Sequence, residues 1–75
     1  MKSLFNQNFK YLVDKCAPPL ETIAIRTGID KVDLSDYYND YNEPDLESAL
    51  ILAHFFKVPI ETFLLANMQA KGSRL

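Results

Sequence analysis

The chain has 75 residues, 48% of them hydrophobic, and a formal net charge of −2. These values are typical of one folded domain with a small core, and they argue against disorder and against a general affinity for nucleic acid. A single cysteine and a single histidine exclude an intramolecular disulfide and a metal site built on cysteine pairs.

The N-terminal fifteen residues alternate between apolar and polar types, which is typical neither of a signal peptide nor of a membrane-spanning segment. We therefore expect a cytoplasmic protein that does not enter a membrane. A single domain is expected over residues 1–75, with about 4–67 ordered and 68–75 frayed.

Helical periodicity predicts a first helix from Leu4 to Lys15. Its apolar face carries Phe5, Phe9, Leu12, Val13 and Cys16. The segment 17–19, Ala-Pro-Pro, ends this helix because proline has no amide hydrogen to donate. A second helix is predicted at 20–26 with Ile23 and Ala24 facing inward, and Gly28 suits a positive φ just after it.

Asp30 is a natural N-cap for a third helix at 31–38, whose expected core residues are Ile29, Leu34 and Tyr37. Pro44 stiffens the approach to a fourth helix at 46–56, which Asp45 caps. For this helix we expect an inward face of Leu46, Leu50, Ala53 and either Phe55 or Phe56. A fifth helix is predicted from Pro59 to about Asn67, burying Ile60, Phe63 and Leu64.

Negative charge is concentrated in one segment, residues 30–47, which has a local charge of −6 while the remainder of the chain has +4. Its seven acids accompany one base, Lys31; they are Asp30, Asp33, Asp36, Asp40, Glu43, Asp45 and Glu47. Such a run is often only a solvated face that keeps a protein soluble. Here, however, it overlaps the third predicted helix.

Two short helices joined by a glycine-containing turn, 20–26 and 31–38, have the spacing of a helix-turn-helix. The wider pattern resembles the phage repressor and Cro family over about residues 8 to 65. The matching positions are Ile23, Ala24, Gly28, Ile29, Leu34, Pro44, Leu46, Leu50, Ala53, Phe56, Val58 and Phe63. This resemblance implies an all-α, five-helix lambda-repressor-like domain, and members of the family bind operators as dimers.

Carried over by position, the family's base-reading residues fall at Lys31, Val32 and Asp36, with Asp33 close by. The amide that grips a phosphate falls at Leu20, and the loop along the DNA backbone is 39–42. Of these residues only Lys31, Asn39 and Asn42 suit DNA. The expected binding surface comprises Leu20, Glu21, Lys31, Val32, Asp33, Ser35, Asp36, Asn39, Asp40, Tyr41 and Asn42.

A second departure from the family concerns a buried ion pair between its first and third helices. The corresponding positions here hold Val13 and Tyr38, so both partners are replaced together and no charge is left unpaired. The sequence therefore predicts that the chain keeps the family's fold, while the surface that contacts DNA in the family has changed.

Aspartates at 33, 36 and 40 would repel DNA phosphates, although a single aspartate can accept a hydrogen bond from cytosine. Our leading hypothesis is a small regulator of a phage-type switch, similar in outline to modulators of repression and antirepressors. It would bind the basic recognition face of a DNA-binding repressor, with Tyr41 as an exposed anchor. The alternative is a Cro-like repressor that binds operator DNA, using bases among Lys10, Lys15, Arg26, Lys31, Lys57, Lys71 and Arg74.

Leu64, Leu65 and Met68 offer a possible homodimer seam on the fifth helix, or else a core residue and an exposed pair. No nucleophile–base pair, glycine-rich phosphate loop or metal cluster is evident, so we expect neither an enzyme nor a cofactor. His54 is expected to be a partly exposed helix residue, and the acidic run lacks the ligand order of a calcium-binding loop.

Overall fold

A computed structural model describes residues 3–16 and 18–68, and within them the chain forms helices and no strand. The helices are α1 (Phe5–Cys16), α2 (Leu20–Thr27), α3 (Lys31–Tyr38), α4 (Leu46–Phe56) and α5 (Ile60–Leu65). The predicted all-α class and its five helices are confirmed, and the bounds of α3 and α4 are the predicted ones. None of the helices in these ranges is long and apolar enough to cross a membrane.

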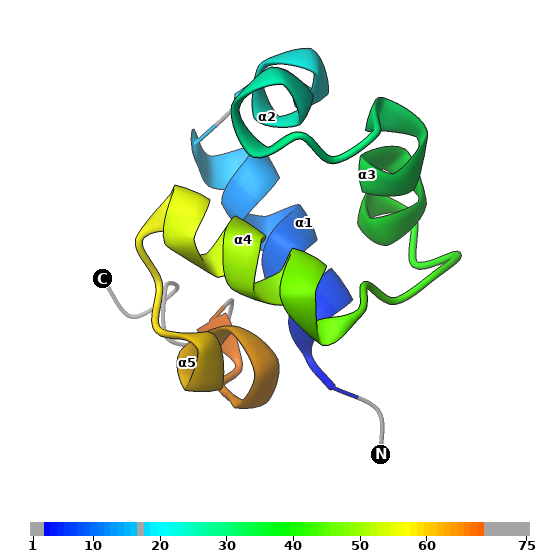
Figure 1. The fold of residues 1–75 in the computed structure, drawn as a ribbon. Helices are drawn as coiled ribbons and strands as arrows, with labels where there is room; N and C mark the ends of the chain where they lie inside the picture. The colour runs from blue at the N-terminus through cyan, green and yellow to red at the C-terminus, as the bar shows by residue number, and fades with distance from the viewer. Residues whose placement is uncertain (1–2, 17, 69–75) are drawn as a thin grey trace.

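The helices surround one core. In Figure 1, α4 runs across the middle of the view, with α2 above it, α3 to the right and α5 below. α1 contacts α3 and α5, whereas α2 contacts α3 and α4, and α4 contacts α5. The predicted frayed tail lies outside the described residues except for Met68, as does Ala17 between α1 and α2.

Short polar residues fix where the helices begin and end. Asp30 Oδ1 accepts a hydrogen bond from the amide of Val32, and Asp45 Oδ1 accepts one from the amide of Ser48, each at 2.8 Å. These N-caps satisfy amides that have no partner within the helix. Gly28 closes α2 with φ 77°, a conformation that costs glycine little. All three predicted roles are confirmed.

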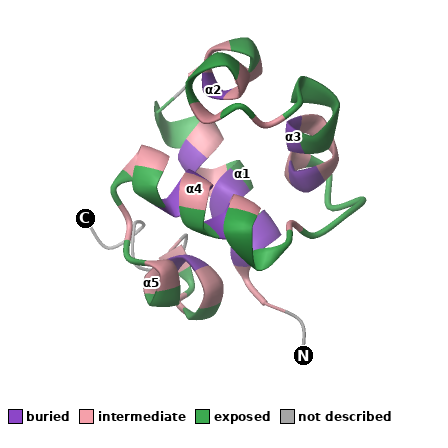
Figure 2. Ribbon diagram, in the orientation of Figure 1, coloured by how far each residue is buried: buried purple, intermediate pink, exposed green. Residues whose placement is uncertain are grey.

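Apolar burial stabilises the fold, and Figure 2 shows the buried positions on the sides of helices that face their neighbours. The core comprises Phe5, Phe9, Leu12, Ile23, Leu34, Tyr37, Ala49, Leu52, Ala53 and Phe63. The rings of Phe5 and Phe63 stack with their centroids 4.4 Å apart, which ties α1 to α5. Ile29, Ile60 and Leu64 pack against this core while remaining partly exposed.

The predicted inward face of α4 is wrong in two positions. Leu46 is 65% exposed and Leu50 45% exposed, whereas Ala49, Leu52 and Ala53 are buried. Because α4 is apolar around most of its circumference, periodicity alone does not select its inner side. The observed side carries two alanines, which let neighbouring helices approach closely.

Cys16 is also exposed, contrary to its expected place on the apolar face of α1. It has the angular position of a core residue, but the buried part of the helix ends one turn earlier, at Leu12. A face predicted from angle alone therefore extends past the point where other helices cover it.

Two buried asparagines on α1 hold other parts of the chain. Asn6 Nδ2 donates to the carbonyl oxygens of Tyr37 (3.0 Å) and Asn42 (2.7 Å). Asn8, with no exposed surface, donates to the carbonyl oxygens of Phe63 (2.7 Å) and Ala66 (2.8 Å). Buried amides of this kind are stabilising only when their hydrogen bonds are made. Neither role is predicted from the sequence.

Candidate interaction surface

The acidic surface is built on α3 and on the loop that follows it, residues 39–42. A tight turn sets α3 against α2: Thr27 Oγ1 donates to the carbonyl oxygen of Ile23 (2.7 Å) and accepts from the amide of Ile29 (3.2 Å). Leu34 and Tyr37 anchor α3 in the core. The remaining sides of the helix are available to carry charge.

Lys31, the one base of the acidic segment, is already paired. Its Nζ donates to Glu21 Oε1 of α2 at 2.8 Å, and this contact lowers the pKa of Glu21 below its ordinary value through the hydrogen bond and the positive charge. Both side chains are exposed, so the pair contributes little to stability. It nevertheless neutralises the only cation on the predicted reading helix.

The two amides that suited DNA are also engaged within the chain. Asn39 Nδ2 donates to the carbonyl oxygen of Ser35 at 3.0 Å, and Asn42 Nδ2 donates to Asp36 Oδ2 at 3.1 Å. All three residues expected to be usable for DNA therefore direct a donor at the protein itself. Contact with a phosphate or a base would first have to replace these bonds.

The carboxylates gather around the outer side of Tyr37. Burial raises the pKa of Tyr37, a hydrogen bond with Ser48 opposes the shift, and the negative charges of Asp33, Asp45 and Asp36 raise the pKa further. Asp33 and Asp40 are exposed, while Asp36 is half-buried. The surface at this end of α3 is therefore negative.

Exposed apolar groups adjoin this charge. Val32 is 67% exposed and Tyr41 is 75% exposed, which confirms the expected position of Tyr41 at the surface. Leu20, in contrast, packs against the core, and Ser35 is half-buried. The structure therefore presents most of the predicted surface but withdraws Leu20 from it.

The acidic loop is held by one backbone hydrogen bond and by one from the side chain of Asn6. The amide of Tyr41 donates to the carbonyl oxygen of Asp36 at 2.9 Å, and Asn6 holds the carbonyl oxygen of Asn42 from below. Asp40 takes a positive φ of 61°, which aspartate tolerates better than most residues. A loop ordered in this way loses little conformational entropy when it binds a partner.

A polar cluster joins α1 to the end of α3, where the sequence predicted an apolar replacement for an ion pair. Tyr38 donates from its hydroxyl to Asp14 Oδ1 at 2.6 Å, and Lys10 Nζ lies 3.0 Å from Asp14 Oδ2. These two contacts, that from Tyr38 first, lower the pKa of Asp14. Val13 and Tyr38 do pack against the core, but the link itself is a surface hydrogen bond.

The bases needed for DNA binding are dispersed and partly occupied. Lys10 pairs with Asp14, and Lys15 Nζ donates to the hydroxyl of Tyr11 at 3.3 Å. Lys71 and Arg74 lie outside the described residues. The described bases come from α1, α2, α3 and the end of α4, so no single helix among the described residues carries them all.

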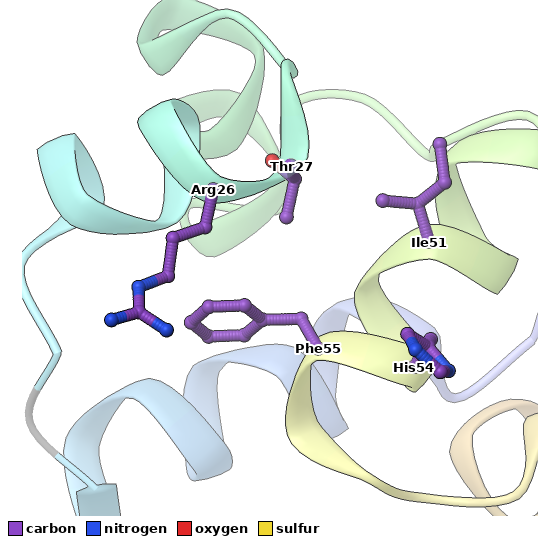
Figure 3. Close-up of a pocket in the computed structure, with 5 residues that line it drawn as sticks. All are labelled: Arg26, Thr27, Ile51, His54 and Phe55. Atoms are coloured by element: carbon purple, nitrogen blue, oxygen red, sulfur yellow. The ribbon is translucent and has the colours of Figure 1, made fainter.

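A separate open hollow of about 390 Å³ lies between α2 and α4. Figure 3 shows the Arg26 guanidinium beside the ring of Phe55, with His54 at the other side of the hollow. Its lining residues are Arg26, Thr27, Ile51, His54 and Phe55. In the described ranges, no three residues among His, Cys, Asp and Glu converge on a common point that could hold a metal ion.

Comparisons of the chain with protein-family models, with curated proteins and with solved structures gave no match. We therefore infer function from the residues themselves, from their charge, exposure and hydrogen bonds.

Proposed function

We propose that this chain is a small transcriptional regulator of a phage-type genetic switch, with a lambda-repressor-like helix-turn-helix formed by α2 and α3. It acts by binding a DNA-binding repressor through its acidic surface on α3 and the loop 39–42, and the adjoining Glu21 of α2 is part of the contact. The residues of this surface are Val32, Asp33, Asp36, Asp40 and Tyr41. The family resemblance of the sequence supports the helix-turn-helix, and the charge of the surface supports a protein partner.

The observation that carries this proposal is that each of the three DNA-suited side chains on the surface already makes a hydrogen bond within the chain. Lys31 binds Glu21, Asn42 binds Asp36, and Asn39 binds the backbone of α3. The rest of this surface is mainly negative or apolar, which complements the basic recognition face of a repressor. Opposite potentials accelerate association and suppress wrong partners, and exposed tyrosine supplies anchoring area.

The test uses a repressor that copurifies with this chain from its native host and that repressor's operator, labelled with a fluorophore. Fluorescence anisotropy of the operator is recorded with the repressor alone and then with increasing amounts of this protein. We expect operator occupancy to change, because the protein competes for or remodels the reading face. Unchanged affinity and occupancy would contradict the proposal.

Two variants locate the surface in the same assay. Asp33→Asn removes one outward charge and Tyr41→Ala removes the exposed ring; each should weaken the complex about tenfold, equivalent to about 1.4 kcal/mol. Glu61→Gln is the matched control, because it removes one negative charge from an exposed residue of α5. An equal loss with Glu61→Gln would indicate only a general charge effect.

The alternative function is direct operator binding by a Cro-like dimer. Lys31, Arg26 and Lys57 would then supply the cations, with the Lys31–Glu21 pair opening on contact with DNA. A gel-shift at low salt with the purified protein and its own upstream region separates the two functions. Specific binding by the protein alone, weakening steeply with added salt, would favour this alternative.

A further inference from the structure

The outer side of α4 carries an apolar stripe that no other part of residues 3–16 and 18–68 covers. Leu46 and Leu50 are one helical turn apart, 65% and 45% exposed, and neither packs against the core. Exposed His54 continues the same line one turn later. At 100° per residue, this stripe points away from the buried Leu52 on the opposite side of the helix.

The two ends of this stripe have opposite charge. Glu43 and Glu47 lie just before and within the first turn of α4, whereas His54 and Lys57 lie at its last turn and C-cap. All four residues are exposed. The charges also suit the helix dipole, which favours acids at the N-terminus and bases at the C-terminus.

We propose that this face binds the same face of a second copy of the chain, with the two α4 helices antiparallel about a two-fold axis at Leu50. In a two-fold interface each residue meets the symmetry-related position of the partner. Leu50 then packs on Leu50 of the partner subunit, and Leu46 packs on the last turn of the partner's helix. This buries the stripe in both copies at once.

Charge decides the antiparallel sense. Glu43 and the partner subunit's Lys57 lie at the same level along the pair of helices, so each end brings unlike charges together. A parallel pairing would instead place the acidic ends side by side and the basic ends side by side. Like charges brought together in this way disfavour an association.

The hollow between α2 and α4 receives a second contact in this dimer. A two-fold axis across antiparallel helices keeps the same flank of each helix on the same side. Glu47 therefore meets the partner at the level of Ala53, on the flank where Ile51 and His54 line the hollow beside Arg26 (Figure 3). Arg26, an exposed cation of the same hollow beyond the Phe55 ring, adds positive charge to the site that this carboxylate approaches.

Sedimentation equilibrium of the full chain over concentrations up to about 1 mM tests the association. We expect a concentration-dependent dimer that Leu50→Glu weakens at least tenfold. Leu65→Glu is the matched control, because Leu65 is a 63%-exposed leucine of α5. A monomer throughout this range, or a dimer lost in Leu65→Glu and kept in Leu50→Glu, would overturn the proposal; the latter outcome would assign the seam to α5.

Separate experiments test the pairing of Glu43 with the partner subunit's Lys57 and the position of the two-fold axis at Leu50. Lys57→Glu should weaken the dimer and the additional change Glu43→Lys should restore it. In a Cys16→Ser background, which removes the exposed native thiol, Leu50→Cys should form a disulfide-linked dimer on mild oxidation and Leu65→Cys should not. Equal cross-linking at both positions would contradict the two-fold axis at Leu50. Circular dichroism checks that each variant is folded.

This dimer does not depend on the proposed repressor binding, because Leu50 and Lys57 lie outside the acidic surface of α3. Leu50→Glu can abolish the dimer while the repressor titration is unchanged, and Asp33→Asn can do the reverse. A failure of the dimer proposal can therefore be distinguished from a failure of the proposed repressor binding.

Discussion

The exposed sides of α3 and α4 carry contrasting chemistry, although the helices follow one another in the chain and each begins at an aspartate cap. α3 turns carboxylates outward and satisfies its polar donors internally, while α4 turns two leucines outward. Caps determine where these helices begin, but they do not determine what each presents to a partner. That choice depends on which side of the helix the rest of the fold covers.

The largest expected effect comes from substituting alanine for a leucine on each of the two sides of α4. Leu52→Ala removes a fully buried side chain and should cost about 3 kcal/mol of unfolding free energy, enough to leave a domain this small barely folded. Leu50→Ala should cost less than about 1 kcal/mol in the monomer. Urea denaturation at low protein concentration measures the free energy of unfolding of both variants. A larger loss for Leu50→Ala than for Leu52→Ala would mean that Leu50, and not Leu52, faces the core.

A smaller effect tests what holds the acidic surface of α3 in place. Asn6→Ala leaves the carbonyl oxygens of Tyr37 and Asn42 without their side-chain donor, which should cost about 1–3 kcal/mol. Amide hydrogen exchange should increase in the loop 39–42 more than in α5. The neighbouring Gln7→Ala, at an exposed position, is the control and should leave the loop unchanged.

Low pH should destabilise the fold, because several carboxyl groups have lowered pKa values in the folded state. Hydrogen bonds hold the pKa of Asp45, at the start of α4, below its ordinary value of 3.8. The pKa values of Asp14 and Glu21 are lowered as well. A lowered pKa in the folded state stabilises the protein above the ordinary pKa, and the contribution is lost as the pH falls through the folded value. Thermal unfolding midpoints should therefore fall as the pH is lowered from about 5 to 3.

Asp45→Asn isolates the cap of α4 within that titration. The amide oxygen still accepts from the backbone of Ser48 but does not titrate in this range. The variant should lose less stability than the unmodified chain over the same pH interval. An identical acid dependence would show that Asp45 does not contribute to it.

The smallest effect concerns the pair between α2 and α3. Glu21→Gln should shift the melting temperature by less than about 2 °C, because exposed ion pairs contribute little. The freed Lys31 lies on the same helix as Asp33 and Asp36, so we expect no specific operator binding by this variant in a gel-shift. Specific binding gained by this change would favour the Cro-like alternative and weaken the contrast between the two helices.

Several parts of the candidate surface were predictable from local sequence. Asp30, Asp45 and Gly28 act through backbone groups only a few residues away, so their roles follow from nearest neighbours along the chain. The excess of acids between 30 and 47 is likewise a property of composition. The exposure of Tyr41 followed from its place in a loop rather than in a helix.

Other parts depended on contacts distant in the sequence. Asn6 meets Asn42 across 36 residues, and Lys31 meets Glu21 on another helix. Two asparagines early in α1 were a weak signal, because asparagine is a poor helix former and its presence there suggests a hydrogen-bonding role. Their partners were not predictable, because every residue has a backbone carbonyl and the sequence does not indicate which one accepts the hydrogen bond.

By itself the sequence determined five helices, three of their caps and the acidic character of α3, because these properties arise from residues close together in the chain. Only the tertiary structure decided that Leu52 rather than Leu50 faces the core, and that Lys31 is engaged by Glu21. In α4 apolar residues surround the helix, so several inward faces were equally apolar. The neighbouring helices cover the side that carries Ala49, Leu52 and Ala53, and they leave Leu46 and Leu50 exposed.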